Sequence, residues 1–270
     1  MITVVSGSPD RIWVPIKPSA TIYMGSIVCV DQSALDEGVI VRGQADGAAD
    51  TTNLDRPYGV AIGHNLISPV FSPTYLAEYI TDEGVTGVRT STTKYRAIPG
   101  PYPFEGIAMV EVALITPSTR LRAPIRNNAI GTAITELTST TGNANGLTVT
   151  TGACDFTPVA NLCAIYCRSG QNAGQYRITD DVSTTVAAWD VEMLKTTATT
   201  GEKYVRVPCR THGVSYVRFG DDTVCSYLNA SETPATNYDI IHVVKLDLTD
   251  SGGEYVEFYF DSDHFSTARA

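Results

Sequence analysis

The fold class of this chain is decided by three short segments: GSIVCV (25–30), EGVIVRGQADG (37–47) and RPYGVAIGHN (56–65). Each segment is rich in valine and isoleucine and is closed by a glycine turn. The β-branched residues stand at alternate positions, a period of two that predicts strands with one buried face. The positions expected to share such faces are Val28, Val30, Val39, Val41, Val60 and Ile62. We therefore expect a small β-barrel or β-sandwich built from tight turns.

The remainder of the chain also reads as strands separated by turns, so the expected fold class is all-β. Residues 121–150 are rich in Thr, Asn and Gly, which predicts a linker or a segment lying on a surface. We therefore expect three parts: an arm with a β domain (1–120), this linker (121–150) and a second β-sandwich-like domain (151–270). Six strands are expected in the second domain: LTVTTG, NLCAIYCRSG, GQYRITDD, KYVRVPCRTHG, VSYVRFGDD and DIIHVVKLDL.

Helical signals are confined to two segments, SPTYLAEYITDEG (72–84) and AAWDVEMLKTT (187–197). In the second segment, Trp189, Met193 and Leu194 have the spacing of one short helical face. Both are expected as short elements that decorate the sheets.

The N-terminal segment, residues 1–24, carries Pro9, Pro15 and Pro18 among apolar residues. Proline lacks a backbone donor, so this segment cannot occupy the middle of a sheet, and we expect an arm extended over a surface. The alternative is an edge segment packed on its own barrel. A second candidate contact is the proline-rich loop AIPGPYPFEG (97–106). The residues expected to contact a capsid or a neighbouring subunit are Ile2, Val4, Ile12, Trp13, Ile16, Tyr102 and Phe104.

Charge and hydropathy limit the classes of partner. The 270 residues carry a net charge of -10 and a sequence pI near 4.8, and their arginines form no basic patch with aromatic neighbours. Nucleic acid is therefore not an expected partner, because phosphate binding needs clustered Lys and Arg. No apolar run approaches the ~20 residues that cross a bilayer. The first residues lack the features of a signal peptide, so we expect synthesis in a cytoplasm and no membrane partner.

The sequence offers no strong catalytic or metal-binding motif, and we expect a protein that is not an enzyme and holds no cofactor. Cys163 and Cys167 are close enough for a zinc ligand pair, but the best second pair is Cys209 with His212. Positions four apart on a strand face the same side, so core packing of these thiols is the favoured interpretation. The acidic pairs at 180–181 and 221–222 are expected as turn residues, with calcium binding as the alternative.

The first 120 or so residues resemble the capsid cement or head decoration proteins of tailed bacteriophages. The resemblance is carried by the N-terminal arm and by MGSIVCVD (24–31), GVIVRG (38–43), RPYGVAIGHN (56–65) and GIAMVEVALI (106–115). It implies a β-rich protein bound to the outer surface of an icosahedral capsid, with the major capsid protein as partner and a homotrimer as the assembled form. It implies no role for the second domain.

Two functions are therefore expected as alternatives. One is a structural virion protein that stabilises the capsid by clamping neighbouring capsid subunits. The other is a virion-surface or tail-associated module that recognises a host receptor or glycan through exposed aromatics. The aromatics considered for that role are Tyr216, Tyr227 and Tyr238.

Overall fold

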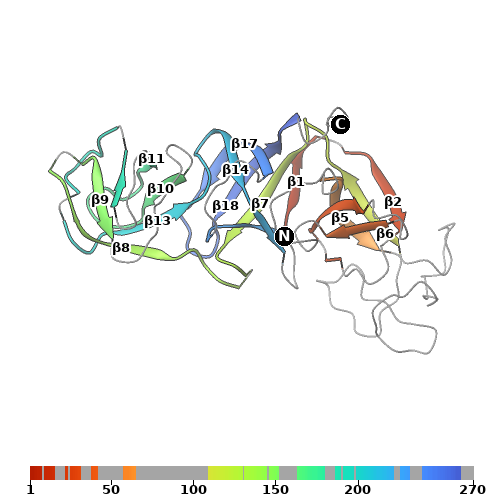
Figure 1. The fold of residues 1–270 in the computed structure, drawn as a ribbon, viewed down its shortest axis with the longest axis horizontal. Coiled ribbons are helices and arrows are strands. Elements are labelled where there is room, and N and C mark those ends of the chain that lie inside the picture. The colour runs from red at the N-terminus through yellow and green to blue at the C-terminus, as the bar shows by residue number, and fades with distance from the viewer. Residues whose placement is uncertain are drawn as a thin grey trace. The chain divides into compact units, whose positions relative to one another are not determined.

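The computed structural model of the chain confirms the all-β fold class (Figure 1). Eighteen strands and no α-helix are found in the part that the structure describes. That part comprises residues 1–7, 9–15, 22–23, 25–31, 38–41, 57–64, 109–129, 131–144, 146–151, 163–179, 186–189, 191–197, 199–221, 226–231 and 239–262. No helix among these residues has the length and apolar character needed to cross a bilayer.

The chain divides into two compact units, and it passes between them four times. Unit 1 comprises Met1–Arg122, Phe219–Tyr227 and Phe260–Ala270. Unit 2 comprises Ala123–Arg218 and Leu228–Tyr259. Both units are discontinuous in sequence, so residues close to the C-terminus belong to the same unit as the N-terminus.

Unit 1 contains a five-stranded antiparallel sheet in the order β2-β6-β5-β3-β4. Its strands are β2 (Arg11–Pro15), β3 (Ile27–Asp31), β4 (Gly38–Val41), β5 (Gly59–His64) and β6 (Met109–Leu114). The three segments that predicted the fold class thus supply β3, β4 and β5. Strand β3 departs from simple alternation, because Ile27, Val28 and Cys29 are all buried. Burial on both faces explains the continuous apolar run.

The N-terminal segment forms strands that pair within its own unit. This is the arrangement expected if the segment is an edge segment of its own barrel. Strand β1 (Thr3–Ser6) pairs antiparallel with the start of β7 (Arg120–Arg126), where Val4 lies opposite Leu121. Strand β2 lies at the edge of the five-stranded sheet and pairs only with β6 among the described strands. Pro15 is the last residue of β2, a position at which a missing backbone donor disturbs no interior ladder.

Unit 2 contains a six-stranded antiparallel sheet in the order β11-β10-β13-β8-β9-β12. Its strands are β8 (Glu136–Gly142), β9 (Thr148–Thr151), β10 (Cys163–Cys167), β11 (Tyr176–Thr179), β12 (Val186–Ala188) and β13 (Lys203–Val207). A turn that includes Gly174 joins the antiparallel strands β10 and β11. Gly174 has a φ of 90° there and donates its N–H to the Cys167 carbonyl at 2.8 Å. A left-handed conformation of this kind favours glycine.

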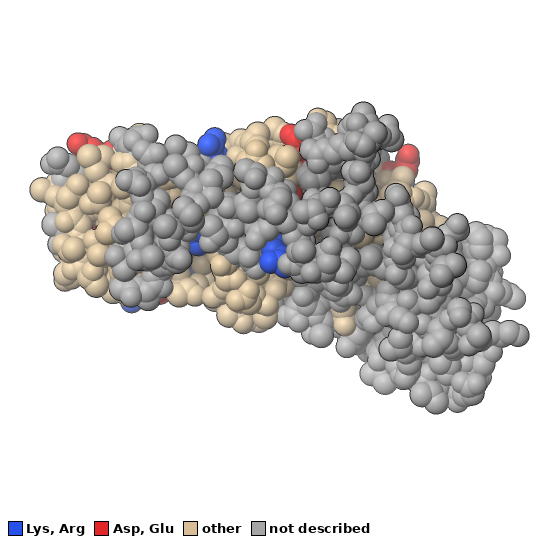
Figure 2. Space-filling model, in the orientation of Figure 1, with Lys and Arg blue, Asp and Glu red and all other residues tan. Residues whose placement is uncertain are grey.

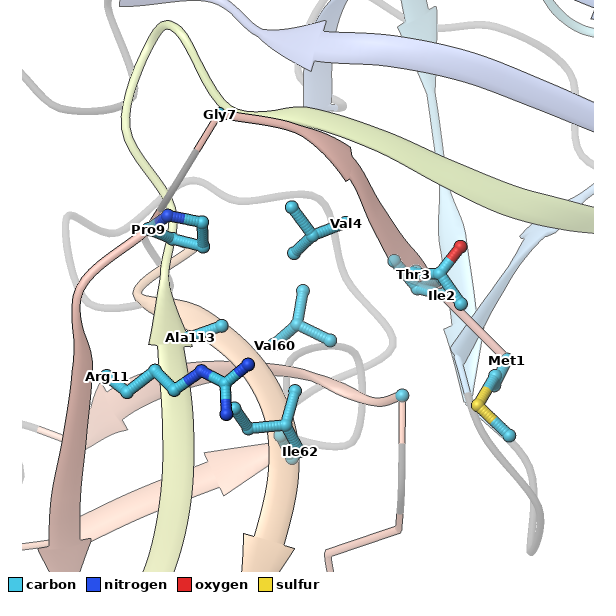
Figure 3. A pocket seen from close by; sticks show the side chains of 12 residues that line it. Met1, Ile2, Thr3, Val4, Gly7, Pro9, Arg11, Val60, Ile62 and Ala113 are labelled. Atoms are coloured by element: carbon cyan, nitrogen blue, oxygen red, sulfur yellow. The ribbon is translucent and has the colours of Figure 1, made fainter.

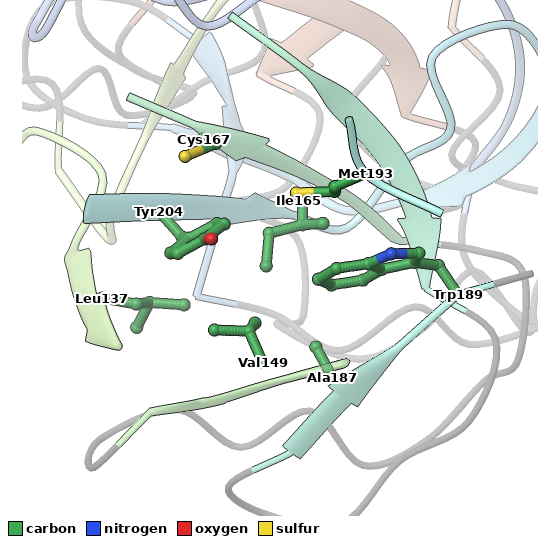
Figure 4. Packing of buried hydrophobic residues seen from close by; sticks show 8 residues of the cluster. All are labelled: Leu137, Val149, Ile165, Cys167, Ala187, Trp189, Met193 and Tyr204. Carbon is green, nitrogen blue, oxygen red and sulfur yellow. The ribbon is translucent and has the colours of Figure 1, made fainter. Parts of the chain in front are cut away.

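The six-stranded sheet curls around one apolar cluster, shown in Figure 4. Side chains from β8, β9, β10, β12 and β13 point into it, together with two residues that follow β12. The members are Leu137, Val149, Ile165, Cys167, Ala187, Trp189, Met193 and Tyr204. Tyr204 and Ile165 are fully buried. This cluster is the core of an incomplete barrel.

The third sheet has the order β14-β17-β18-β7-β16-β15, with β1 pairing to β7 off this path. Its further strands are β14 (Gly213–Val217), β15 (Phe219–Asp221), β16 (Ser226–Asn229), β17 (Asp239–Asp247) and β18 (Tyr255–Phe260). Strand β17 buries alternate residues, among them Ile241 and Val243, on one face. All six strands expected after residue 150 are present, although VSYVRFGDD supplies both β14 and β15.

Two sequence-based expectations are wrong. Residues 121–150 contain most of β7, all of β8 and most of β9 in place of a linker. The threonine-rich β8 satisfies its polar groups: buried Ser139 donates its hydroxyl to the Thr199 carbonyl at 3.0 Å and accepts from the Glu202 N–H at 3.0 Å. A polar strand of this kind leaves no buried group unpaired, so it needs few large apolar residues.

The helix expected over 187–197 is also absent. Ala187 lies in β12 opposite Val149, and the Met193 N–H donates to the Gly146 carbonyl at 2.9 Å. The backbone of this segment therefore bonds to a distant part of the chain and not along a helix. Trp189 and Met193 do share one apolar surface, but Leu194 points to solvent. The other helix candidate, 72–84, lies outside the described residues.

Candidate functional site

Among its described residues, unit 1 has a groove beside β1 with a volume of about 540 Å³. We call it the N-terminal groove. Its walls are mainly apolar, and Figure 3 shows Val4 from β1 and Val60 from β5 pointing into the same space. Ile62 and Ala113 extend this wall, while Arg11 supplies the charged part of the lining. Grooves of this size and composition suit an apolar side chain or a short peptide.

The chain is held tightly at one end of this groove. The Ile2 N–H donates to the Gly25 carbonyl at 3.2 Å, and the Ile2 side chain is buried. Gly25 has a φ of 79°, and a Cβ there would lie 2.5 Å from the Met1 Cβ. The close approach of the two backbones therefore requires glycine at position 25. The neighbouring side chains of Met1 and Val5 are left 58% and 39% exposed.

Arg11 makes a long ion-pair contact at the groove, 3.9 Å from its Nη1 to the Glu111 Oε1. The Arg11 side chain is 68% exposed, so water screens this pair and it contributes little to stability. The guanidinium can therefore turn toward an acidic group of a partner with little loss of stability.

The structure separates the residues expected to contact a partner. Val4 lines the groove, and Ile12 and Trp13 are half-buried on edge strand β2. Ile2 also borders the groove but is only 2% exposed, so it packs mainly in the core of its own unit. Three further candidates, Ile16, Tyr102 and Phe104, lie outside the described residues. The sequence-based prediction missed Met1 and Val5, although these exposed residues alternate along the chain with buried Ile2 and half-buried Val4, which is a usable signal.

The cysteines of the described part are buried and free, and burial raises the pKa of three of them. The pKa of Cys167 rises from 9.0 to about 11, and the pKa values of Cys163 and Cys209 are also raised by burial. A reactive cysteine needs a lowered pKa, because the thiolate is the nucleophile. These thiols stay protonated near neutral pH. Core packing of Cys167 beside Ile165 is confirmed (Figure 4).

Glu202 and Tyr204 of unit 2 are a buried acid and a buried hydroxyl, residue types that also occur in catalytic sites. Their hydrogen bonds are those of a structural group that holds a turn. The Tyr204 hydroxyl donates to the Glu202 carboxylate at 2.6 Å, and the Gln171 N–H donates to the same carboxylate at 2.8 Å. Desolvation by burial raises the Tyr204 pKa, so this hydroxyl stays protonated. Glu202 therefore holds the 169–172 turn in place.

A second buried polar group in unit 2 links residues that lie beside β18, beside β10 and in β7. The Glu254 carboxylate pairs with Arg168, from the end of β10, and with Arg126 of β7 at 3.4 Å. Arg168 also contacts Glu136 at 3.2 Å and the Leu248 carbonyl at 3.3 Å. Every charge in this ion-pair cluster has a partner, which is the pattern of a structural group. Arg126 is thus bound to residues of its own unit, including the Gly252 carbonyl at 2.7 Å.

The remaining candidates from the sequence show no functional site among the described residues. Within the described ranges, no three His, Cys, Asp or Glu side chains are placed to hold a metal ion. The side chains of both acidic pairs, 180–181 and 221–222, lie outside those ranges. Tyr227 is buried and cannot serve as an exposed aromatic, whereas Tyr216 is half-buried. On the face shown in Figure 2, the described Lys and Arg side chains appear as isolated groups.

No family model matches the chain, no curated protein matches it, and no solved structure matches it.

Proposed function

We propose that the protein is a structural, non-enzymatic component of a tailed-phage virion that binds the outer surface of the capsid through unit 1. The observation that carries this proposal is the N-terminal groove, together with the exposed Met1 and Val5 beside it. The sequence resemblance of the same residues to capsid decoration proteins supports the choice of partner.

The chemistry of the groove is suited to attachment. Apolar surface removed from water stabilises a complex by roughly 25 cal/mol per Å² before association costs are subtracted. The groove and its apolar margin supply such surface, and its wall already has a fixed backbone. Few side chains of this protein therefore lose conformational entropy on binding, so most of the free energy from burying apolar surface contributes to affinity.

The charged residues support the same assignment. Arg11 is free to turn toward a carboxylate of the capsid, while the acidic balance of the chain disfavours its attachment to nucleic acid. In this proposal one copy contacts neighbouring major capsid subunits and opposes their separation. The threefold arrangement implied by the resemblance would place three copies around each junction.

The experiment measures decoration of capsids by variants of the full chain. Expanded heads of the phage that encodes the protein are purified without it and mixed with Val4→Asp or Ile62→Asp, which both change a side chain that lines the groove. Bound protein is quantified after sedimentation. Fully burying a valine-sized side chain contributes about 1.5–3 kcal/mol, so we expect apparent affinity to fall at least about tenfold.

Val214→Asp is the matched control, because it places the same charge on a strand valine that is 37% exposed. It lies on β14, outside the groove, and should decorate heads like the unmodified protein. Thermal unfolding checks that all three variants fold. Equal loss of decoration in the control, or none in the groove variants, would contradict attachment through this surface. Binding to host cells and not to heads would favour the receptor-recognition alternative.

A further inference from the structure

The loop that follows β12, residues 191–197, exposes two large aliphatic side chains in unit 2. Val191 is 67% exposed and Leu194 is 81% exposed, the two highest values among the described large hydrophobic residues. Three residues of chain separate them by at most about 11 Å. Isolated exposed aliphatics are common, but two on one short loop form a candidate contact surface.

The backbone of this loop is fixed by side chains from the neighbouring turn and strand. Arg177 donates from Nε to the Val191 carbonyl at 2.7 Å and from Nη2 to the Glu192 carbonyl. The Leu194 N–H donates to the Gln175 side-chain oxygen at 3.1 Å. These hydrogen bonds connect β11, one edge strand of the six-stranded sheet, to the segment that follows β12, the other edge strand.

Asn172 and the barrel core fix the second half of the loop. The buried Asn172 amide accepts from the Lys195 N–H at 3.0 Å and donates to the Lys195 carbonyl at 3.2 Å. Between the two exposed aliphatics, the Met193 side chain inserts into the core cluster (Figure 4). Val191 and Leu194 are therefore held out on a rigid support, so ordering them in a complex costs little entropy.

The loop also carries one acid and one base. Glu192 and Lys195 are exposed, and neither makes an ion pair with any residue of the described part. Each charged residue is adjacent to an exposed aliphatic, Glu192 to Val191 and Lys195 to Leu194. A surface of this composition is complementary to itself: in a two-fold arrangement, each acid faces the base of the other copy while the aliphatics meet between them.

We propose that the 191–197 loop is a self-association surface whose occupant is the same loop of a second copy. Glu192 of each copy pairs with Lys195 of the other, and Val191 and Leu194 pack across the two-fold axis. The contact is small, in the range of weak and transient interfaces, so it requires high protein concentration in solution. On a shared surface, closely spaced copies would meet at a high effective concentration. The proposal does not depend on capsid binding.

Sedimentation velocity of the full chain, from micromolar to about millimolar concentration, tests the proposal. We expect the unmodified protein to double its mass with increasing concentration. Leu194→Asp should abolish the doubling. Glu192→Lys and Lys195→Glu should each weaken it at least about tenfold, because like charges then face each other. The double variant, Glu192→Lys with Lys195→Glu, should restore it, and Val214→Asp should behave as the unmodified protein.

All substituted side chains are exposed, so the variants should keep their fold, which circular dichroism verifies. A constant mass for the unmodified protein over this range would overturn the proposal. Doubling that persists in Leu194→Asp would place the contact elsewhere. Single charge reversals without effect, or a double variant that stays as weak as the singles, would exclude the two-fold pairing.

Discussion

Replacement of Glu254 by Gln is expected to destabilise unit 2 severely. The Glu254 side chain is fully buried and pairs with Arg168, which is 7% exposed, and with Arg126, which is 15% exposed. Glutamine keeps the shape but removes the buried charge that both largely buried guanidinium groups face, and Arg168 retains the more exposed Glu136. Removing one partner of a buried ion pair costs about 3–5 kcal/mol, and we expect a loss in that range.

Glu136→Gln is the matched control, because Glu136 contacts the same Arg168 at 3.2 Å but is 41% exposed. Arg168 keeps Glu254 in this variant, and a screened pair contributes at most about 1 kcal/mol. Denaturant unfolding is followed by tryptophan fluorescence in a Trp13→Phe background, so that buried Trp189 reports on unit 2. Equal losses in the two variants, or a loss below about 1 kcal/mol for Glu254→Gln, would refute the assigned role of the ion-pair cluster.

Three further predictions concern the core, the sheet of unit 1 and the thiols. Met193→Ala should cost about 2–5 kcal/mol in denaturant unfolding, whereas Leu194→Ala should stay within about 0.5 kcal/mol; similar values for both would contradict their opposite placement. Gly59→Ala should lower the melting temperature, since a Cβ there would lie 2.1 Å from a Val112 methyl group, while Gly131→Ala, with open space around it, should not. Because burial raises the Cys167 pKa to about 11, its thiol ionises first in the unfolded chain. The free energy of unfolding should therefore fall as pH rises from about 9 toward 11, and less steeply in Cys167→Ala; parallel pH profiles would contradict this reasoning.

The sequence predicted several of the strands whose apolar residues are large, although it missed β18. Val28, Val60 and the DIIHVVKLDL segment have clear β patterns, and each lies in a strand. Strand β8 was missed because one of its two buried positions is Ser139, whose burial depends on bonds to Thr199 and to Glu202, about sixty residues away. No local pattern records such partners.

The candidate surfaces were less predictable for the same reason. The spacing of Trp189 and Met193 correctly placed both on one apolar surface, yet a helix was expected where the Met193 backbone bonds to Gly146. The exposure of Leu194 then follows from the loop geometry and not from its hydrophobicity. The N-terminal groove likewise depends on the meeting of β1 with β5 and β6, which are separated by long stretches of chain.

The central claim, that this is a capsid-surface protein, is tested most directly by cryo-electron microscopy of expanded heads mixed with excess purified protein. The account predicts ordered density on the outer surface at every equivalent lattice position, into which unit 1 fits with the N-terminal groove against the shell. Bare heads under these conditions, or ordered density that contacts the shell only through unit 2, would contradict it.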